Sequence, residues 1–526
     1  MAESSGGAVQ GNGLTRQTNW WGAFVIGLAG TILVTGIAPV MVTSLGAASI
    51  PITIFVTATG YLLCLFLAEL SAMMPHRSGG SPSYAYVAFK GRWPRLAKHV
   101  NGATAWMYWL GWFPVAPLNL ILAAALLVGK LNLSQDGFTP IDNKISYWAV
   151  AISLLGLFII LAVALRGVRL GAMFATVLGL LSMVPLTFLA LAPFFHPAAV
   201  DWTELSGFHR LNGDSFFSTH TIVENGAAVS STGWSTLYLA YAFLLTWNVI
   251  AMEAAACYIG ECRNPARDAK IAMNLEGLYG LFIYSMIPIG LVAALGAKQL
   301  DGDLLKTDGA GDIAKVFSAY VHKLFSAGGE WVDWTVTITL VIALMLSALN
   351  AIMGCARSLY QMSLDGQFPR IFARLNADGA PVFSILFNIV CSAVVVFFGG
   401  AVAIWVFSNV GYIGSFVPVL VGYYLLRQDS PNAARPVRLP EFMKYVALAI
   451  AALYFIIWTY GGYQCCAMQL AGSKTLYYFI GCAVIVAYLP LYVYRVYVED
   501  KRYAIPAITA PMIDSQPAPA NADPGE

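Results

Sequence analysis

Long apolar runs separated by short polar segments dominate the chain. A transmembrane helix needs about 20 apolar residues to cross a bilayer, and windows of that size predict twelve spans. The predicted spans lie near residues 20–44, 50–73, 101–129, 146–165, 170–195, 232–259, 271–297, 331–360, 382–400, 402–426, 443–464 and 475–497. The pattern therefore predicts an all-α integral membrane protein with twelve transmembrane helices and both termini on one side.

Composition agrees with this prediction. Of the 526 residues, 59% are hydrophobic and only 11% are charged, whereas charged residues make up about a quarter of a soluble protein. The formal net charge of +2 gives no reason to expect a nucleic-acid partner. Most of the eight cysteines fall inside apolar runs without metal-ligand spacing, so we expect no disulfide framework, no metal and no cofactor.

The placement of positive charge predicts the orientation. Cytoplasmic loops of membrane proteins carry an excess of Lys and Arg. Placing the N-terminus in the cytoplasm puts 21 of the 29 Lys and Arg residues on the cytoplasmic side. The first 18 residues lack the apolar core of a signal peptide. We therefore expect a multi-pass protein of the cell (inner) membrane with both termini cytoplasmic.

Spans 1 and 6 share residues that weaken a helix. Span 1 contains Gly30, Thr35, Gly36 and Pro39, and in a helix Gly costs about 1 kcal/mol and Pro about 3 kcal/mol relative to Ala. Span 6 carries Thr246 and Asn248 at membrane depth, where their side chains can compete for backbone hydrogen bonds. Interrupted helices five spans apart predict an inverted-repeat transporter with its site near the midplane. A simple proline kink with glycine packing is the alternative.

Four groups of short motifs occur along the chain in a fixed order. They are Val34–Ile37; Ala68–Leu70 with Pro75, Ser78–Gly80 and Tyr84–Tyr86; Ala251–Glu253 with Glu261 and Asn264–Pro265; and Ala356–Arg357 with Tyr360, Asp365–Gly366, Pro369, Gly379 and Pro381. In these motifs the chain resembles the amino acid–polyamine–organocation (APC) family of secondary transporters. The resemblance covers most of residues 20–426 and implies two inverted five-helix repeats, with broken helices 1 and 6, plus two extra helices.

The resemblance and the broken spans together predict the organisation of the chain. The predicted segments are a cytoplasmic N-terminal tail at 1–19, a first repeat (helices 1–5) at 20–195, a second inverted repeat (helices 6–10) at 232–426, helices 11 and 12 at 440–498 and a disordered cytoplasmic tail at 499–526. The two long outer loops at 196–231 and 298–330 translocate whatever their charge and carry little weight in the orientation.

The broken spans also predict the substrate site. Unwinding near Thr35–Ala38 would free backbone N–H groups that suit a carboxylate, and unwinding near Phe243–Asn248 would free carbonyl groups that suit an ammonium group. An α-amino acid carries both charges on one carbon atom, and the resemblance implies the same arrangement. The predicted substrate-binding residues are Thr35, Gly36, Ile37, Ala38, Trp112, Asn119, Phe243, Trp247 and Asn248.

Four polar residues are candidates for coupling or gating. They are Glu253, Ser347, Asn350 and Glu69. Glu253 matches the acid that the family carries in span 6. An ionisable group at membrane depth is a functional-site hypothesis by default, and burial favours the protonated form of a carboxyl group. Glu253 therefore either carries a proton or is a static hydrogen-bond partner. Ser347 either contacts an ion or substrate, or bonds to a carbonyl group one turn back.

Two further observations concern the coupling ion. Many family members carry a Lys in span 5, where this chain has Gly179. A proton, a sodium ion, exchange and facilitated diffusion all remain open as coupling modes. Glu276, near the inner end of span 7, is expected to reach water.

Secondary active transport of an amino acid by alternating access is the favoured function. A neutral amino acid is favoured because the candidate lining residues other than Glu253 are Thr, Asn, Trp and Gly. The alternatives are transport of an amine, such as ethanolamine or a polyamine, and amino acid exchange. An enzyme is disfavoured because all six histidines lie in loops or near span ends, and a channel because no pore motif repeats. The expected partners are the small-molecule substrate and the lipid bilayer, with the oligomeric state open.

Overall fold

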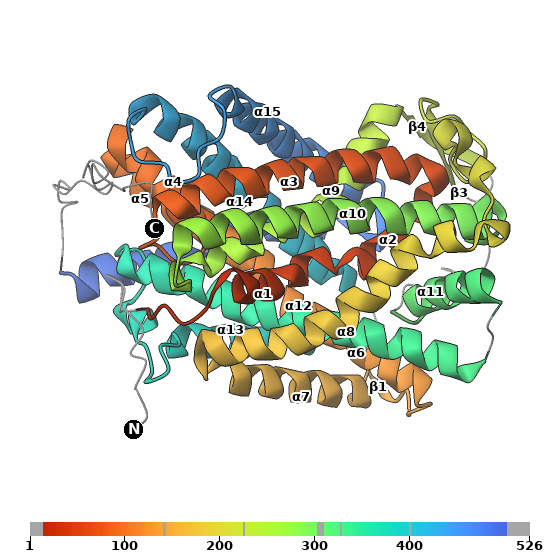
Figure 1. Cartoon of the computed structure of the whole chain (residues 1–526), viewed down its shortest axis with the longest axis horizontal. Helices are drawn as coiled ribbons and strands as arrows, with labels where there is room; N and C mark the ends of the chain where they lie inside the picture. Colours follow the sequence, from red (N-terminus) through yellow and green to blue (C-terminus); the bar gives the residue numbers. More distant parts are fainter. Residues whose placement is uncertain are drawn as a thin grey trace, which may run out of the picture.

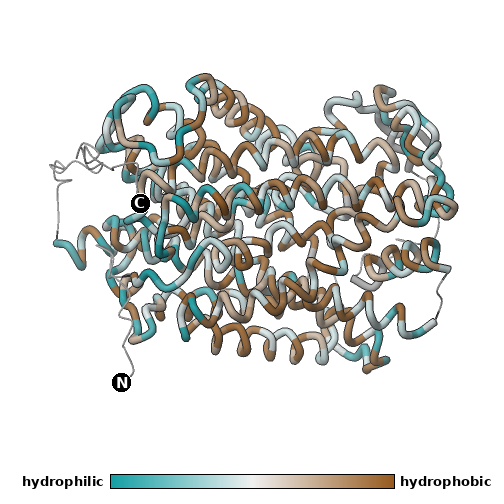
Figure 2. Tube along the Cα trace, in the orientation of Figure 1, coloured by the Kyte–Doolittle hydropathy of each residue, from teal (hydrophilic) through white to brown (hydrophobic). Residues whose placement is uncertain are grey.

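The computed structural model describes residues 14–139, 144–224, 227–301, 310–326, 329–398 and 401–501. Within these ranges the long helices lie side by side along a common axis (Figure 1). Polar residues gather at the two ends of this bundle and apolar residues occupy its middle (Figure 2). Most of the two predicted tails, residues 1–13 and 502–526, lies outside the described residues.

The described helices follow the predicted spans closely. Up to residue 195 they are α1 (Trp20–Thr31), α2 (Val34–Leu45), α3 (Ser49–Met73), α4 (Ser81–Arg92), α5 (Pro94–Trp112), α6 (Val115–Lys130), α7 (Tyr147–Ala164) and α8 (Gly167–Phe195). The next are α9 (Trp234–Ile250), the 3₁₀ helices η4 (Ala251–Cys257) and η5 (Ile259–Glu261), α10 (Pro265–Leu300), α11 (Ala310–Phe325), α12 (Glu330–Leu364), α13 (Val382–Val396) and α14 (Ala401–Asp429). The last are α15 (Met443–Ile456), α16 (Gly462–Ala467), α17 (Thr475–Val484) and α18 (Leu489–Val493).

The protein also contains two short antiparallel pairs of β-strands. Strand β1 (Gly137–Phe138) pairs antiparallel with β2 (Ile145–Ser146), and β3 (His220–Glu224) pairs antiparallel with β4 (Ala227–Thr232). Strands β3 and β4 lie at one end of the bundle, and α4 lies at the other end (Figure 1). The two long predicted outer loops contain most of the hairpin β3–β4 and the whole of helix α11.

Ten helical stretches in the described part of the chain are long and apolar enough to cross a membrane. The first, Trp20–Met73, contains two of the predicted spans, and Val382–Val396 is a shorter apolar helix within another. These stretches establish a multi-pass, helical membrane protein. The count of twelve spans and the inverted repeat stay predictions.

Span 1 is interrupted, but two residues earlier than predicted. Helix α1 ends at Thr31, and α2 begins at Val34. The predicted unwinding at Thr35–Ala38 was therefore wrong, because these residues belong to α2. Pro39 lies inside α2 as well, so the proline that suggested the break does not cause it.

Span 6 changes its helix type and also does so later than predicted. Helix α9 stays α-helical through Phe243–Asn248, and the 3₁₀ helix η4 begins at Ala251. Thr246 Oγ1 donates to the carbonyl oxygen of Ala242 at 2.5 Å, and Asn248 Nδ2 donates to that of Leu244 at 3.1 Å. Both side chains thus bond one turn back along an intact helix, and the predicted unwinding at these residues was wrong.

Candidate substrate site at the junction of two interrupted helices

Small residues bring the two interrupted spans into direct contact. A Cβ atom added at Gly27 of α1 would lie 2.6 Å from the backbone nitrogen of Ala255, and one added at Gly30 would collide with the backbone of Ala251. Real Cβ atoms do not approach so closely. Helix α1 therefore lies on η4 at a distance that only glycine permits, which is the small-residue packing typical of membrane helices.

One hydroxyl group joins the two interruptions. Tyr284 of α10 is buried, and its hydroxyl oxygen lies 3.1 Å from the carbonyl oxygen of Gly30 and 3.0 Å from that of Asn248. Gly30 is in the last turn of α1 and Asn248 is in the last turn of α9. The hydroxyl proton is thus available to the ends of both helices, where carbonyl groups lose their intrahelical partners.

Open space lies beside the start of α2. No heavy atom is within 4 Å of the position that a Cβ atom would take on Gly36, and Gly36 is half-buried whereas its neighbours Thr35, Ile37 and Ala38 are buried. The prediction that the N–H groups here are free was wrong. Thr35 donates to Ile32 at 3.3 Å and Gly36 to Leu33 at 3.0 Å. A carboxylate could reach these N–H groups only if the local turn opened.

Three aromatic rings form a cluster next to the junction. The ring centroids of Trp112, Trp247 and Tyr412 lie 5.3–5.5 Å from one another, and all three side chains are buried. Trp247 Nε1 donates to the carbonyl oxygen of Gly111 at 3.1 Å. The structure thus brings together Trp112 and Trp247, two of the predicted site residues, and adds Tyr412 from α14.

Glu253 lies beneath this aromatic cluster. Its side chain is completely buried, and its Oε1 accepts hydrogen bonds from Tyr108 at 2.9 Å and from Tyr412 at 2.7 Å. Within the described residues, its Oε2 has no hydrogen-bond partner, and neither has Nε1 of Trp112. The Trp112 side chain still lies close enough to interact with this carboxyl group, which has no cationic partner in the described part of the chain.

Of the other predicted binding residues, Asn248 is 7% exposed and lies at the junction. The carbonyl group of Phe243 accepts a hydrogen bond from Asn409 Nδ2 at 3.1 Å, so it is not free for an ammonium group in this conformation. Asn119 is buried in α6, and its Nδ2 lacks a partner among the described residues. An unsatisfied buried donor calls for a water molecule or a ligand.

The two candidates on α12 have different surroundings. Asn350 accepts a hydrogen bond from Tyr258 at 2.8 Å, which ties α12 to the residue that follows η4. The hydroxyl group of Ser347 is buried without a described partner. The alternative of a bond one turn back therefore does not hold for Ser347. The position that holds Lys in many family members is apolar here, because Leu28 and Leu346 are the nearest neighbours of Gly179.

Glu69 belongs to an ionic cluster rather than to the junction. It forms a buried ion pair with Arg427 and a second one with Arg435, at 3.1 Å. Beyond the spans, Glu441 lies 3.2 Å from Arg427, and a hydrogen bond from Lys444 lowers the pKa of Glu441 below its usual value. This cluster ties α3 to α14 and to the segment before α15.

Two further buried ion pairs connect other elements of the bundle. Arg357 of α12 pairs with Glu261 of η5, with both side chains buried. Arg77, after α3, pairs with Asp365 at 2.6 Å just beyond the end of α12. Charged groups out of water need such partners. These pairs tie α12 to η5 and to the segment after α3.

Sequence reasoning missed four residues of the site: Tyr108, Tyr412, Tyr284 and Glu276. A tyrosine inside an apolar run gives no signal, because its ring is as typical of a membrane helix as its hydroxyl group is of a site. The expectation that Glu276 reaches water was wrong, since its side chain is completely buried.

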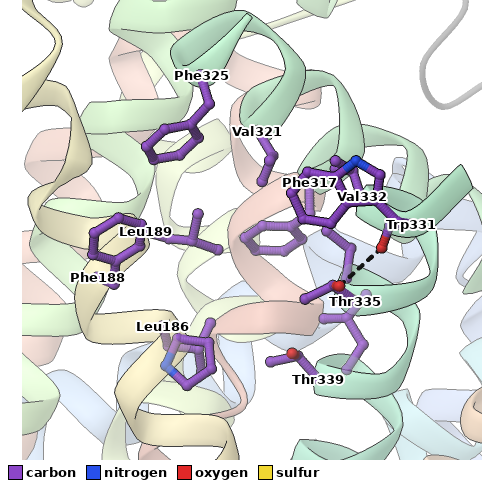
Figure 3. Close-up of a pocket in the computed structure, with 13 residues that line it drawn as sticks. Leu186, Phe188, Leu189, Phe317, Val321, Phe325, Trp331, Val332, Thr335 and Thr339 are labelled. Atoms are coloured by element: carbon purple, nitrogen blue, oxygen red, sulfur yellow. Dashed lines mark hydrogen bonds between the residues drawn. The ribbon is translucent and has the colours of Figure 1, made fainter. Parts of the chain in front are cut away.

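A separate apolar groove lies between α8, α11 and α12 (Figure 3). Phe188, Phe317 and Trp331 line it, and the one hydrogen bond drawn there joins Thr335 Oγ1 to the backbone of Trp331 at 2.8 Å. Phe188 and Trp331 are more than half exposed. The groove contains none of the predicted site residues and suits contact with lipid rather than with a zwitterion.

Comparison with known proteins agrees with this architecture. A family model described as amino acid permease matches residues 19–488. A vacuolar cationic amino acid transporter of Arabidopsis thaliana is 26% identical over 35% of this chain and 27% of its own length. A putative arginine/ornithine antiporter of Bacillus subtilis is 24% identical over 65% of this chain and 68% of its own. A polyamine transporter of Arabidopsis thaliana is 24% identical over 72% of this chain and 66% of its own.

These relatives are transporters of amino acids or amines, and none of these descriptions names an enzyme. The match to the family model runs from the start of α1 nearly to the end of the described helices, and the motifs that carry the resemblance lie within it. The chain therefore belongs to the amino acid permease family of membrane transporters, within the APC group.

Proposed function

We propose that this protein carries an amino acid across the cell membrane by alternating access. The substrate binds where the α1–α2 interruption meets the α9–η4 transition. The observation that carries this proposal is the close packing of the two interrupted spans at Gly27 and Gly30, with open space beside Gly36 in α2 and the buried polar side chains of Asn248 and Glu253 in α9 and η4.

The organisation proposed for this transport is an inverted repeat. The repeats comprise α1 to α8 and α9 to α14, and α15 to α18 lie outside them. Both termini are cytoplasmic in this scheme, and the membrane is the cell (inner) membrane. The turn at Ile32–Leu33 and the 3₁₀ helix η4 are the parts that change conformation, because neither has the regular hydrogen bonding of an α-helix.

A neutral amino acid is the proposed substrate class. Its carboxylate would take the N–H groups of Thr35 and Gly36, and its ammonium group would face carbonyl groups near Asn248. Trp247 and Trp112 would cover its side chain. No Lys, Arg or Asp occurs at this junction within the described residues.

An amine or a cationic amino acid is the second candidate. The cluster of Trp112, Trp247 and Tyr412 above the carboxyl group of Glu253 supports it, because aromatic faces and a carboxylate both attract cations. Three relatives are described as transporters of cationic amino acids, arginine and ornithine, or polyamines.

The experiment that tests the proposal is a thermal-shift screen of the purified protein followed by counterflow in proteoliposomes. The screen uses the common amino acids, ethanolamine, agmatine and putrescine, because a ligand of the folded state raises the apparent melting temperature. Stabilisation and saturable counterflow by a neutral amino acid support the first candidate, and by an amine or a cationic amino acid the second. Uptake that shows no counterflow would contradict a carrier mechanism.

A further inference from the structure

Helix α10 directs a row of three residues at the junction. Glu276, Gly280 and Tyr284 are spaced four residues apart, which places them on one face of a helix. Tyr284 contacts the ends of α1 and α9, as described above. A Cβ atom at Gly280 would lie 2.8 Å from the side chain of Met252 in η4. One face of α10 therefore contacts both interrupted spans.

Glu276 belongs to this contact and lies against both interrupted spans. Its Oε2 accepts a hydrogen bond from the N–H group of Ala255 in η4 at 3.2 Å. A Cβ atom at Gly27 of α1 would lie 2.5 Å from Oε1 and 2.7 Å from Oε2 of Glu276. The carboxyl group thus lies in the seam between α1 and η4, and a larger residue at position 27 would displace it.

The carboxyl group of Glu276 is completely buried, and only one of its two oxygen atoms has a hydrogen-bond partner. Within the described residues, Oε1 has no hydrogen-bond partner, and no ion pair includes Glu276. An ionised carboxylate without a cationic partner is very costly in such a place. A proton on Oε1 removes that charge, so the neutral form of Glu276 is the stable one while the seam between α1 and η4 is closed.

The groups around Glu276 offer no compensating charge. Glu253 and Cys257 face it from η4, Cys64 faces it from α3 and Tyr412 from α14. Each of these groups is neutral or negative. Helix α1 carries no titratable residue, and the only charged residue of α8, Arg169, lies in its first turn. Ionisation of Glu276 would therefore leave a bare charge between the helices that must move apart.

A sodium ion suits this position less well than a proton. Sodium needs several oxygen ligands, whereas the group that contacts Oε2 is an N–H donor.

We propose that Glu276 is the proton-binding site through which this transporter couples substrate movement to a pH gradient. This inference rests on the proposed transport function and names its coupling ion. One proton from water on one side binds Oε1 and neutralises the carboxylate while the seam is closed. When α1 and η4 separate, the same proton leaves to water on the other side. One positive charge thus moves with each cycle.

The first test needs no substrate. Infrared difference spectra of the purified protein between acidic and alkaline buffer detect the carbonyl stretch of a protonated, buried carboxyl group. We expect such a band in the native protein and in the Glu253→Gln variant, and its loss in Glu276→Gln. Native and Glu276→Gln spectra with the same carboxyl bands would overturn the proposal.

The second test measures coupling. The Glu276→Gln variant mimics the neutral carboxyl group, so its melting temperature should stay close to that of the native protein. The probe is the ligand with the largest thermal shift in the screen above. Accumulation driven by a pH gradient should be lost in Glu276→Gln, whereas counterflow, which needs no net proton movement, should fall much less.

The possible results separate the two proposals. The role of Glu276 would be overturned if accumulation by the native protein did not depend on the pH gradient. It would also be overturned if the Glu276→Gln variant accumulated substrate as the native protein does. In both cases counterflow would still support transport. Absence of counterflow for every probe in the native protein would instead contradict the proposed function. The Glu276→Asp variant, which keeps the acid on a shorter side chain, should retain part of the accumulation.

Discussion

At the scale of single residues, the site is defined by polar atoms that lack partners. Those in the transmembrane core near the junction include Thr31 Oγ1, Glu253 Oε2, Trp112 Nε1, Ser347 Oγ and Glu276 Oε1. A buried polar group left without a hydrogen bond costs about 1–3 kcal/mol. These atoms are concentrated around α1, α5, η4, α10 and α12. This indicates a site where a substrate, an ion or a proton supplies the missing hydrogen-bond partners.

Trp247 provides the first prediction at this scale. The Trp247→Ala substitution removes one ring of the aromatic cluster and the hydrogen bond to Gly111, so uptake should fall at least tenfold, equivalent to about 1.4 kcal/mol. Uptake by proteoliposomes with equal amounts of protein measures it. Trp234→Ala is the matched control, because Trp234 lies on the same helix and is 42% exposed. Equal uptake by the two variants would remove Trp247 from the site.

Glu253 provides the second prediction. The Glu253→Gln substitution keeps an acceptor for Tyr108 and Tyr412 but cannot ionise. Because this carboxyl group lies under the aromatic cluster, the pH dependence of the apparent substrate affinity should flatten, whereas accumulation driven by the pH gradient should persist. Concentration dependence of uptake across a pH series measures both. An unchanged pH profile of affinity would reduce Glu253 to a static partner of two tyrosines.

At the scale of elements, the sequence predicts that spans 1 and 6 are special but not where they change. Most of the sequence signals, among them Gly36, Pro39, Thr246 and Asn248, lie in regular α-helix, whereas Gly30 lies in the last turn before the interruption of span 1. The interruptions follow instead from contacts between distant segments. Gly27 and Gly30 let α1 lie on η4, and Tyr284 bridges the two helix ends. Except for the contact between Tyr284 and Asn248, these contacts join residues more than 200 positions apart and leave no periodic trace in a single sequence.

The bridge by Tyr284 gives a prediction at this scale. The Tyr284→Phe substitution removes the single hydroxyl proton that the buried carbonyl groups of Gly30 and Asn248 share, so the free energy of unfolding should fall by about 1–3 kcal/mol. Thermal unfolding of the purified protein measures the change. Tyr279→Phe is the control on the same helix, since its hydroxyl group bonds to Thr187 and to the carbonyl oxygen of Met183 at a half-buried position away from the junction. A larger loss of stability in the control would show that Tyr284 does not hold the junction.

At the scale of the whole molecule, the apolar pattern predicted the membrane architecture well, because the length of an apolar run is set directly by bilayer thickness. The pairing of buried charges could not be predicted in the same way. Glu69 was proposed for gating, and its partners Arg427 and Arg435 lie more than 350 positions away. The ion pairs Glu69–Arg427 and Glu261–Arg357 thus become visible only when the helices are assembled.

The buried pairs give a prediction for the whole bundle. The Arg357→Met substitution leaves Glu261 buried without its cation, and breaking such a pair costs about 3–5 kcal/mol. Arg92→Met is the control, because the ion pair between Arg92 and Asp429 is exposed and pairs of this kind contribute about 0–1 kcal/mol. Melting temperatures of the two variants in detergent test the difference. Equal losses would show that the buried pair does not hold α12 to η5.

The central claim is that the substrate binds where the two interrupted spans meet. An experimental structure of the protein with the ligand selected by the thermal-shift screen tests this claim most directly. The account predicts ligand density between Gly36 of α2 and Asn248 of α9, in contact with Trp247. Density confined to another place, such as the groove between α8, α11 and α12, with the junction closed and continuous in its packing, would contradict it.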